Sequence, residues 1–178
     1  MADKGVVYGS TQPLIAGVPA GEGVWKADIF GCLNDWWPNC CMSFFCPCVS
    51  LAQTLHRVGI YKYSVALLIF GGLWLLMNIA ESVQYDRTKP LVGEYQWAAV
   101  DTWAFAYLVF GVIYLFLVVD ARAKIRKMFQ VQGSWCEDFW CSLCCQWCVI
   151  AQMATQVEAY DKGECSFGPK DTLPGYNA

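Results

Sequence analysis

The sequence has little that would support an enzyme or a nucleic-acid-binding protein. Only one of its 178 residues is His, and charged residues make up 15% of the chain. A single His excludes a His-rich metal site, and a net charge of −3 argues against nucleic-acid binding, which normally uses a basic face. The sequence shows no Ser-His-Asp arrangement, no phosphate-binding glycine loop before Lys-Ser/Thr and no H-E-x-x-H motif. We therefore expect neither catalysis nor a nucleic-acid partner.

The two ends of the chain also lack features that would direct or anchor it. Residues 1–24 carry five Gly and two Pro without any period, which predicts a disordered N-terminal tail. No continuous apolar stretch follows Lys4, so a secretory signal peptide is not predicted. Ala2 stands where the myristoylation motif needs Gly. Residues 166–178 are interpreted as a C-terminal tail.

Two long apolar runs dominate what the sequence does contain. Hydrophobic residues make up 57% of the chain, and residues 64–80 and 102–119 hold no charged side chain. A helix needs roughly 20 mostly apolar residues to cross a bilayer. With their aromatic flanks the two runs predict transmembrane helices at about 63–83 and 98–119. The expected fold is an all-α membrane protein with two transmembrane helices plus cysteine-rich cytosolic interfacial helices.

Lys and Arg near the two runs indicate the orientation of the chain. Arg57 and Lys62 precede the first run, and the connecting loop, 81–101, has two basic residues against four acidic ones. The four basic residues that follow the second run are Arg122, Lys124, Arg126 and Lys127. The excess of basic residues predicts that both termini are cytosolic. Thiols in this reducing compartment favour metal thiolates or S-acylation over structural disulfides.

Cysteine-rich segments lie on both sides of the apolar runs, at residues 32–58 and 136–160. Cys41-x6-Cys48-Val49 aligns with Cys141-x6-Cys148-Val149 at an offset of one hundred, which indicates an internal duplication. An Ala-Gln pair follows in each copy, with one residue of slippage. Pro47 suits a helix that starts at Cys48 and ends near Val58. In the second copy we expect a helix from Phe139 to about Tyr160.

On a continuous second helix the four cysteines at i, i+3, i+4 and i+7 would share one face. They are Cys141, Cys144, Cys145 and Cys148. Trp residues flank both segments and place them at headgroup level along the inner leaflet. These residues are Trp36, Trp37, Trp135, Trp140 and Trp147.

The cysteine pattern resembles a known family. Cys40-Cys41-x4-Cys46-Pro47-Cys48 matches CC-x4-CPC, the signature of the PLAC8 family, which includes plant cadmium resistance proteins, cell-number regulators and cornifelin-like proteins. The stretch "DFWCSLCCQWCVIAQ", which ends at Gln152, resembles the family's second cysteine block. The resemblance covers about residues 25–165. It implies a plasma-membrane location, self-association and movement of divalent metal ions, with zinc, cadmium and calcium all as candidates.

The role of the thiols stays open between three interpretations. Four thiolates complete a tetrahedral shell for Zn²⁺ or another soft divalent cation, and Cys46 and Cys48 could join Cys145 and Cys148 in one shell. Juxtamembrane cysteines are also sites of palmitoylation. In the third interpretation they pack as small apolar residues or form an internal disulfide. The candidate metal ligands are Cys40, Cys41, Cys46, Cys48, Cys141, Cys144, Cys145 and Cys148.

Polar residues near the outer ends of the spans form a candidate ion pathway. Asn78 and Glu81 lie on one side of the first helix, and Asp101 begins the second. From Asp101 to Asp120 a helix rises about 28 Å, close to the thickness of the hydrocarbon core. A ring of carboxylates from Glu81 or Asp101 in an oligomer of about five copies would concentrate divalent cations at a pore mouth. Alternatively both are ordinary interfacial residues, and Asn78 makes a hydrogen bond between helices.

Two functional hypotheses follow from these features. The first is an oligomeric plasma-membrane protein that lets divalent metal cations cross, with membrane lipids, other copies of itself and the metal ions as partners. The second is a non-conducting scaffold or signalling protein that regulates cell number and is clustered through acylated cysteines.

Overall fold

The computed structural model describes residues 23–88 and 102–174, all of whose named elements are helical. Two short helical turns, η1 (Gly31–Asn34) and η2 (Trp36–Cys40), lead into α1 (Cys41–Phe45) and α2 (Pro47–Arg57). Two long helices follow, α3 (Tyr63–Thr88) and α4 (Thr102–Met128), and then α5 (Trp135–Cys144) and α6 (Gln146–Gln156).

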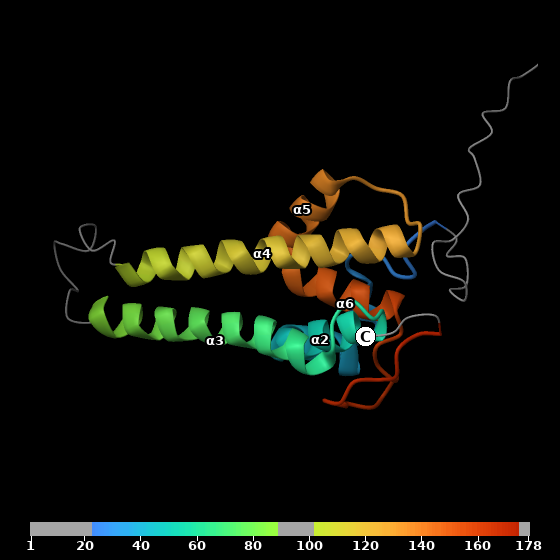
Figure 1. The fold of residues 1–178 in the computed structure, drawn as a ribbon, viewed down its shortest axis with the longest axis horizontal. Coiled ribbons are helices and arrows are strands. Elements are labelled where there is room, and N and C mark those ends of the chain that lie inside the picture. Colours follow the sequence, from blue (N-terminus) through green and yellow to red (C-terminus); the bar gives the residue numbers. More distant parts are fainter. Residues whose placement is uncertain (1–22, 89–101, 175–178) are drawn as a thin grey trace, which may run out of the picture.

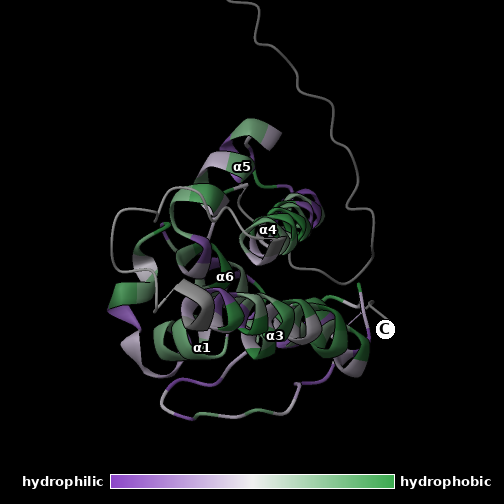
Figure 2. Cartoon of the chain, turned by 90° about the vertical axis from the view of Figure 1, so that its left-hand side faces the viewer, coloured by the Kyte–Doolittle hydropathy of each residue, from purple (hydrophilic) through white to green (hydrophobic). Residues whose placement is uncertain are grey.

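The two long helices lie side by side and extend beyond the rest of the molecule (Figure 1). All the shorter helices gather around one end of the pair. Both cysteine-rich segments therefore lie at the same end, which is the arrangement that the predicted topology requires. A hydropathy-coloured view along the helices shows hydrophobic residues over both α3 and α4 (Figure 2). Each is long and apolar enough to cross a membrane.

Local signals in the sequence explain where the short helices begin. Pro47 occupies the first turn of α2, where its missing N–H has no intrahelical partner to lose. At α5, the Ser134 side chain accepts a hydrogen bond from the backbone N–H of Glu137 (3.2 Å). Ser134 and Glu137 stand in the spacing of a capping box.

The core lies where α2 and α6 pack against the cysteine-end halves of α3 and α4. Leu51 and Leu55 of α2 and Ile150 and Met153 of α6 are fully buried there. Facing residues from the long helices are Phe70, Tyr114, Val118 and Ile125. Burying each large apolar side chain contributes about 1.5–3 kcal/mol. This core fixes the geometry of the cysteine-rich segments.

Three predicted helices differ from the structure. The first long helix continues past residue 83 to Thr88. The helix predicted from Phe139 to about Tyr160 is wrong, because the chain leaves helical geometry at Cys145 (φ −147°, ψ 75°) and restarts as α6. The second long helix continues past residue 119 to Met128, and its added turns bury Arg122 and Ile125 against the short helices. The predicted helix from Cys48 to about Val58 is confirmed within one residue at each end.

Candidate functional site

The two cysteine-rich segments are structural repeats of one another, with an offset of 99 residues. In each, a helix ends at a cysteine whose backbone is not helical, Cys46 (φ −131°, ψ 56°) or Cys145 (φ −147°, ψ 75°). An 11-residue helix follows in each, with Val58 or Val157 as its C-cap. The next residue has positive φ in both copies, 66° at Gly59 and 53° at Glu158.

Backbone hydrogen bonds repeat with the same offset. The N–H of Cys46 donates to the carbonyl of Met42, as that of Cys145 donates to Cys141. The closing bonds of the two 11-residue helices, Ile60 to Leu55 and Ala159 to Ala154, are both 3.0 Å long. The offset of 99 aligns Ala52-Gln53 with Ala151-Gln152 without slippage. Alignment of the cysteines at an offset of one hundred was therefore off by one residue.

The equivalent glutamines of the repeats are buried and fasten other parts of the chain. Gln53 Nε2 donates to the carbonyls of Ser166 and Gly168 (2.7 and 2.8 Å). Gln152 Nε2 donates to the carbonyl of Ala27 (2.8 Å). Each glutamine thereby holds a non-helical segment against its helix. Gln152 was singled out as a motif residue, and its position gives it a structural role.

Asp138 is the centre of a buried ion-pair network. Asp138 lies inside α5, is 1% exposed, and accepts hydrogen bonds from Arg122 Nε (3.1 Å) and Arg126 Nε (2.9 Å). Arg122 also donates to Gln152 Oε1 (2.5 Å), and its guanidinium lies 4.5 Å from the centroid of the Trp25 ring. These contacts tie α4, α5 and α6 together. Sequence reasoning had used the two arginines only to orient the chain.

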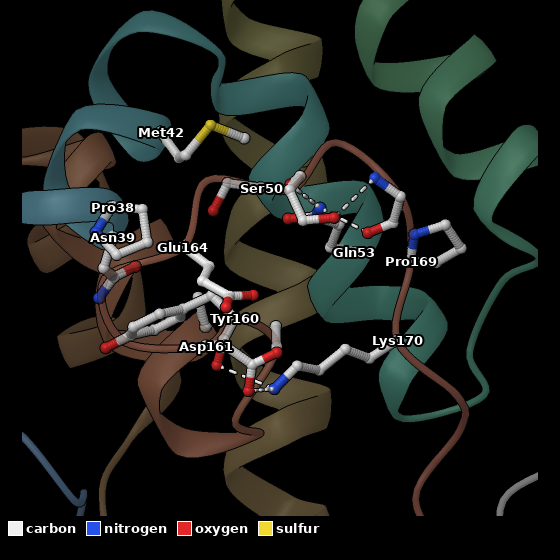
Figure 3. Close-up of a pocket in the computed structure, with 14 residues that line it drawn as sticks. Pro38, Asn39, Met42, Ser50, Gln53, Tyr160, Asp161, Glu164, Pro169 and Lys170 are labelled. Atoms are coloured by element: carbon white, nitrogen blue, oxygen red, sulfur yellow. Dashed lines mark hydrogen bonds and ion pairs between the residues drawn. The ribbon is translucent and has the colours of Figure 1, made fainter.

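A small polar pocket of about 70 Å³ lies between the first repeat and the C-terminal segment (Figure 3). Asn39 Nδ2 donates there to the carbonyl of Ala151 (3.1 Å) and to Thr155 Oγ1 (2.9 Å), and Lys170 Nζ lies 2.6 Å from Asp161 Oδ1. The Tyr160 hydroxyl donates to Asp35 Oδ2 (2.5 Å). Burial and this bond raise the pKa of Tyr160 to about 12. The hydrogen bonds around the pocket join the segment before α1 to α6 and to Tyr160.

Four sulfur atoms meet on the other side of α6. Cys32 of η1 and Cys148 of α6 are buried together with Ala151, and Cys40 and Cys145 pack against them. We call Cys32, Cys40, Cys145 and Cys148 the sulfur cluster. Cys145 and Cys148 are joined as a disulfide, with Cα atoms 5.3 Å apart. Burial, with a contribution from Cys32, raises the pKa of Cys40 to about 11, so the Cys40 thiol is protonated at neutral pH.

The cluster differs from the four-cysteine shell expected from the sequence. Cys46 is the non-helical residue between α1 and α2. Cys48 packs against the main core beside Gly71 of α3, and its Cβ lies 3.9 Å from where a Cβ on Gly71 would stand. Burial raises the pKa of Cys48. The described residues hold no group of three or more His, Cys, Asp or Glu side chains arranged for a metal ion. Cys32, which sequence reasoning left out, takes the place expected for Cys46 or Cys48.

The other predicted ligands lie apart from the cluster or at its edge. Cys41 lines a groove beside the cluster, whereas Cys141 packs against the main core. Cys144 is exposed on α5, as is Cys136. The groove has a volume of about 280 Å³ and is almost entirely apolar, with walls that include Trp36, Phe44 and Trp147.

Two of the candidate ion-pathway residues, Asn78 and Glu81, lie in the half of α3 that is far from the cysteines. Asn78 Nδ2 donates to the carbonyl of Trp74 (2.7 Å) in its own helix, and Glu81 is exposed. Asp101 lies outside the described residues. Within one copy of the chain, the structure thus gives Glu81 an aqueous or lipid-facing position.

The aromatic residues that flank the cysteines are exposed. Trp36, Trp135 and Trp140 are 60%, 52% and 60% exposed, and Trp37 and Trp147 are similar. Large aromatic side chains that stay exposed beside apolar helices are typical of proteins at a membrane interface.

Comparison with known proteins gives a family and two relatives. A family model described as "PLAC8 family" matches residues 25–156. Protein Plant Cadmium Resistance 2 of Arabidopsis thaliana is 24% identical over 140 residues, which is 79% of this chain and 70% of that protein. Cell number regulator 3 of Zea mays is 23% identical over 142 residues, 76% of this chain but only 62% of the maize protein. No solved structure matches the chain significantly.

Proposed function

Because the chain belongs to the PLAC8 family, we propose that it is a non-catalytic membrane protein whose copies assemble and let divalent metal ions cross the plasma membrane. One observation carries the proposal. Four sulfurs meet in a cluster at one end of two helices that are long and apolar enough to span a bilayer. Thiolates favour soft divalent cations such as Cd²⁺ and Zn²⁺, and one relative is named for cadmium resistance.

Membrane insertion is supported by the surface of the long helices. Only 17% of the apolar window in α3 and 22% of that in α4 are buried within the chain. Leu68 of α3 and Phe105 of α4 are 76% and 64% exposed. An apolar surface of this size needs lipid or another copy of the chain as its surroundings. We expect both termini and both cysteine segments to lie on the cytosolic side.

Assembly follows from the small size of the protomer. Two helices cannot enclose an aqueous path, whereas a ring of about five copies can. Glu81 is exposed near the end of α3 that lies farthest from the cysteines. In a ring, the carboxylates of Glu81, together with Asp101, would attract divalent cations to the outer mouth.

Metal flux into liposomes that contain the purified full-length protein tests this proposal. The intact protein should admit Cd²⁺ or Zn²⁺ to a trapped metal-sensitive dye. Glu81→Gln and Asp101→Asn should slow entry several-fold at low ionic strength and less in high salt. Glu164→Gln is the matched control, since it removes an exposed carboxylate at the cysteine end. Absence of flux with the intact protein would contradict the transport proposal.

A second candidate function has its own support. Cys136 and Cys144 are exposed on α5 beside Trp135 and Trp140, where thiols can accept acyl chains from the membrane side. One relative is named as a cell number regulator. We propose as the alternative a non-conducting scaffold clustered by acylated cysteines. Hydroxylamine-sensitive mass on these two cysteines in protein from its native membrane, without metal flux, would favour the scaffold.

A further inference from the structure

The sulfur cluster has the composition of a closed metal site, although two of its sulfurs are joined. It consists of Cys32, Cys40, Cys145 and Cys148, packed around Ala151. Cys32 and Cys148 are 5% and 8% exposed. Cys40 packs against Cys32 and Cys148. Structural zinc sites use four such sulfurs at tetrahedral positions.

The disulfide leaves the cluster with fewer than four free thiols. Cys145 and Cys148 are joined by the S–S bond. A metal ion requires a thiolate as its ligand, and a disulfide sulfur is not a thiolate. Only the two thiols of Cys32 and Cys40 remain, too few for a closed shell. Reduction would return two more thiols at the same place.

We propose that reduction of the Cys145–Cys148 disulfide opens a four-thiolate site for Cd²⁺ or Zn²⁺, formed with Cys32 and Cys40, so that this disulfide controls metal binding. The inference rests on the proposed function, because it names the intracellular site at which a transported ion is held. It replaces the shell of Cys46, Cys48, Cys145 and Cys148 expected from the sequence.

The chemistry balances with a cytosolic dithiol as the reductant. Its two thiols give two electrons and two protons to the S–S bond, and the reductant becomes a disulfide while Cys145 and Cys148 become thiols. The metal ion then displaces the four protons of the cluster thiols and forms four metal–sulfur bonds. Four thiolates with one divalent cation leave a charge of −2.

The fold provides partial compensation for that charge. Cys145 is the N-cap of α6, an 11-residue helix, and Cys148 lies in its first turn. The first-turn N–H groups and the positive end of the helix dipole stabilise negative charge at this position. Cys46 and Cys48 stand near the equivalent end of α2, but neither belongs to the cluster that holds Cys32 and Cys40. The first repeat therefore lacks the site that the second repeat can form.

A direct test is Cd²⁺ binding by the full-length protein in detergent, with and without a phosphine reductant. We expect the reduced protein to bind one tight Cd²⁺ per chain and to show the sulfur-to-cadmium charge-transfer absorption of four thiolates. The oxidised protein should bind at least about tenfold more weakly. Cys32→Ser and Cys148→Ser in the reduced protein should each weaken Cd²⁺ binding by at least roughly 10- to 100-fold. Loss of a residue that only supports a metal ligand already costs this much affinity.

Cys46→Ser is the matched control, since Cys46 holds in the first repeat the place of Cys145 in the second. It should leave binding unchanged, and helical circular dichroism should show that every variant is folded. The proposal is overturned if reduction does not change Cd²⁺ binding, if Cys46→Ser abolishes it while Cys32→Ser does not, or if Cys40 carries a hydroxylamine-sensitive acyl group.

Liposome flux separates this inference from the proposed function. Flux by intact protein that binds no Cd²⁺ at the cluster would overturn the inference and leave transport standing. Reduction-dependent binding without flux would support the inference and contradict transport.

Discussion

At the residue scale, one buried carboxylate holds together three helices at the cysteine end. Asp138 is 1% exposed and pairs with Arg122, which is 2% exposed, and with Arg126. Removal of one partner from such a network leaves a buried charge without compensation, which costs more than an exposed ion pair contributes.

Asp138→Asn should therefore lower the free energy of unfolding by about 3–5 kcal/mol, because the two guanidinium groups lose the carboxylate that they share. Chemical unfolding of the purified protein in detergent, followed by helical circular dichroism, measures this loss. Glu137→Gln, next to it but exposed, should change stability by only about 0.5 kcal/mol. Equal stability of the two variants would contradict the role given to Asp138.

A second prediction at this scale concerns Tyr160, whose pKa is raised to about 12 by burial and by its bond to Asp35. Folding favours the neutral phenol. The contribution of Tyr160 to the free energy of unfolding is therefore complete below the ordinary pKa of 10 and is lost as pH rises from 10 to about 12. Tyrosinate absorbance of the native protein minus that of Tyr160→Phe should show one group titrating near pH 12. A midpoint near 10 would contradict both the burial of the phenol and its bond to Asp35.

At the element scale, the repeat is the feature that organises the cysteine end. Two helix–break–helix units share their breaks, their closing hydrogen bonds and a buried glutamine, but they hold different segments. Gln53 fastens residues 166–168, and Gln152 fastens Ala27. Each bond to a buried carbonyl is worth about 1 kcal/mol when made, and more is lost when a buried group is left without a partner.

Gln53→Ala should release the C-terminal segment without unfolding the helices, since the carbonyls of Ser166 and Gly168 lose their donor. Amide hydrogen exchange should become faster by about tenfold for residues 165–170, because a tenfold change corresponds to a loss of about 1.4 kcal/mol in the local stability of this segment. Exchange in α5 should stay unchanged. Gln132→Ala, at an exposed position, is the control. Unchanged exchange in the C-terminal segment of the Gln53 variant would contradict this role.

The sequence predicts an element well when residues within that element determine where it begins and ends. Both long helices and the start of α2 follow from apolar runs and from Pro47, and they are confirmed. The break at Cys145 has no Pro or Gly to mark it, so periodicity alone predicted one helix. The Ala-Gln pairs, aligned at 99 residues, carried the signal that the second segment breaks like the first.

The candidate site was harder to predict, because it depends on contacts between distant segments. Cys32 lies outside the CC-x4-CPC motif, and only packing of η1 on α6 brings it to Cys148. Arg122 and Arg126 stand four residues apart and so share one helix face. That spacing was the available sign that both could meet one acidic partner.

At the scale of the whole molecule, an apolar pair of helices stands out from a packed cysteine end. Leu75, near the middle of α3, is 55% exposed. Leu75→Lys should make insertion about 3–4 kcal/mol less favourable, because an ammonium replaces an apolar side chain at the bilayer centre. The protein recovered in carbonate-washed membranes should fall, whereas Gln132→Lys should have no effect. Equal recovery would contradict the assignment of α3 as a span.

The sidedness of the thiols tests the account most directly, because metal delivery to the cytosol requires the cysteine end to lie inside. Intact cells that express Gly93→Cys, in the connecting loop that is predicted to lie outside, would be treated with a membrane-impermeant maleimide and the labelled peptides mapped by mass spectrometry. We predict labelling at residue 93 in intact cells, and at Cys136 and Cys165, both exposed, only after permeabilisation. Labelling of Cys136 or Cys165 in intact cells would contradict the account.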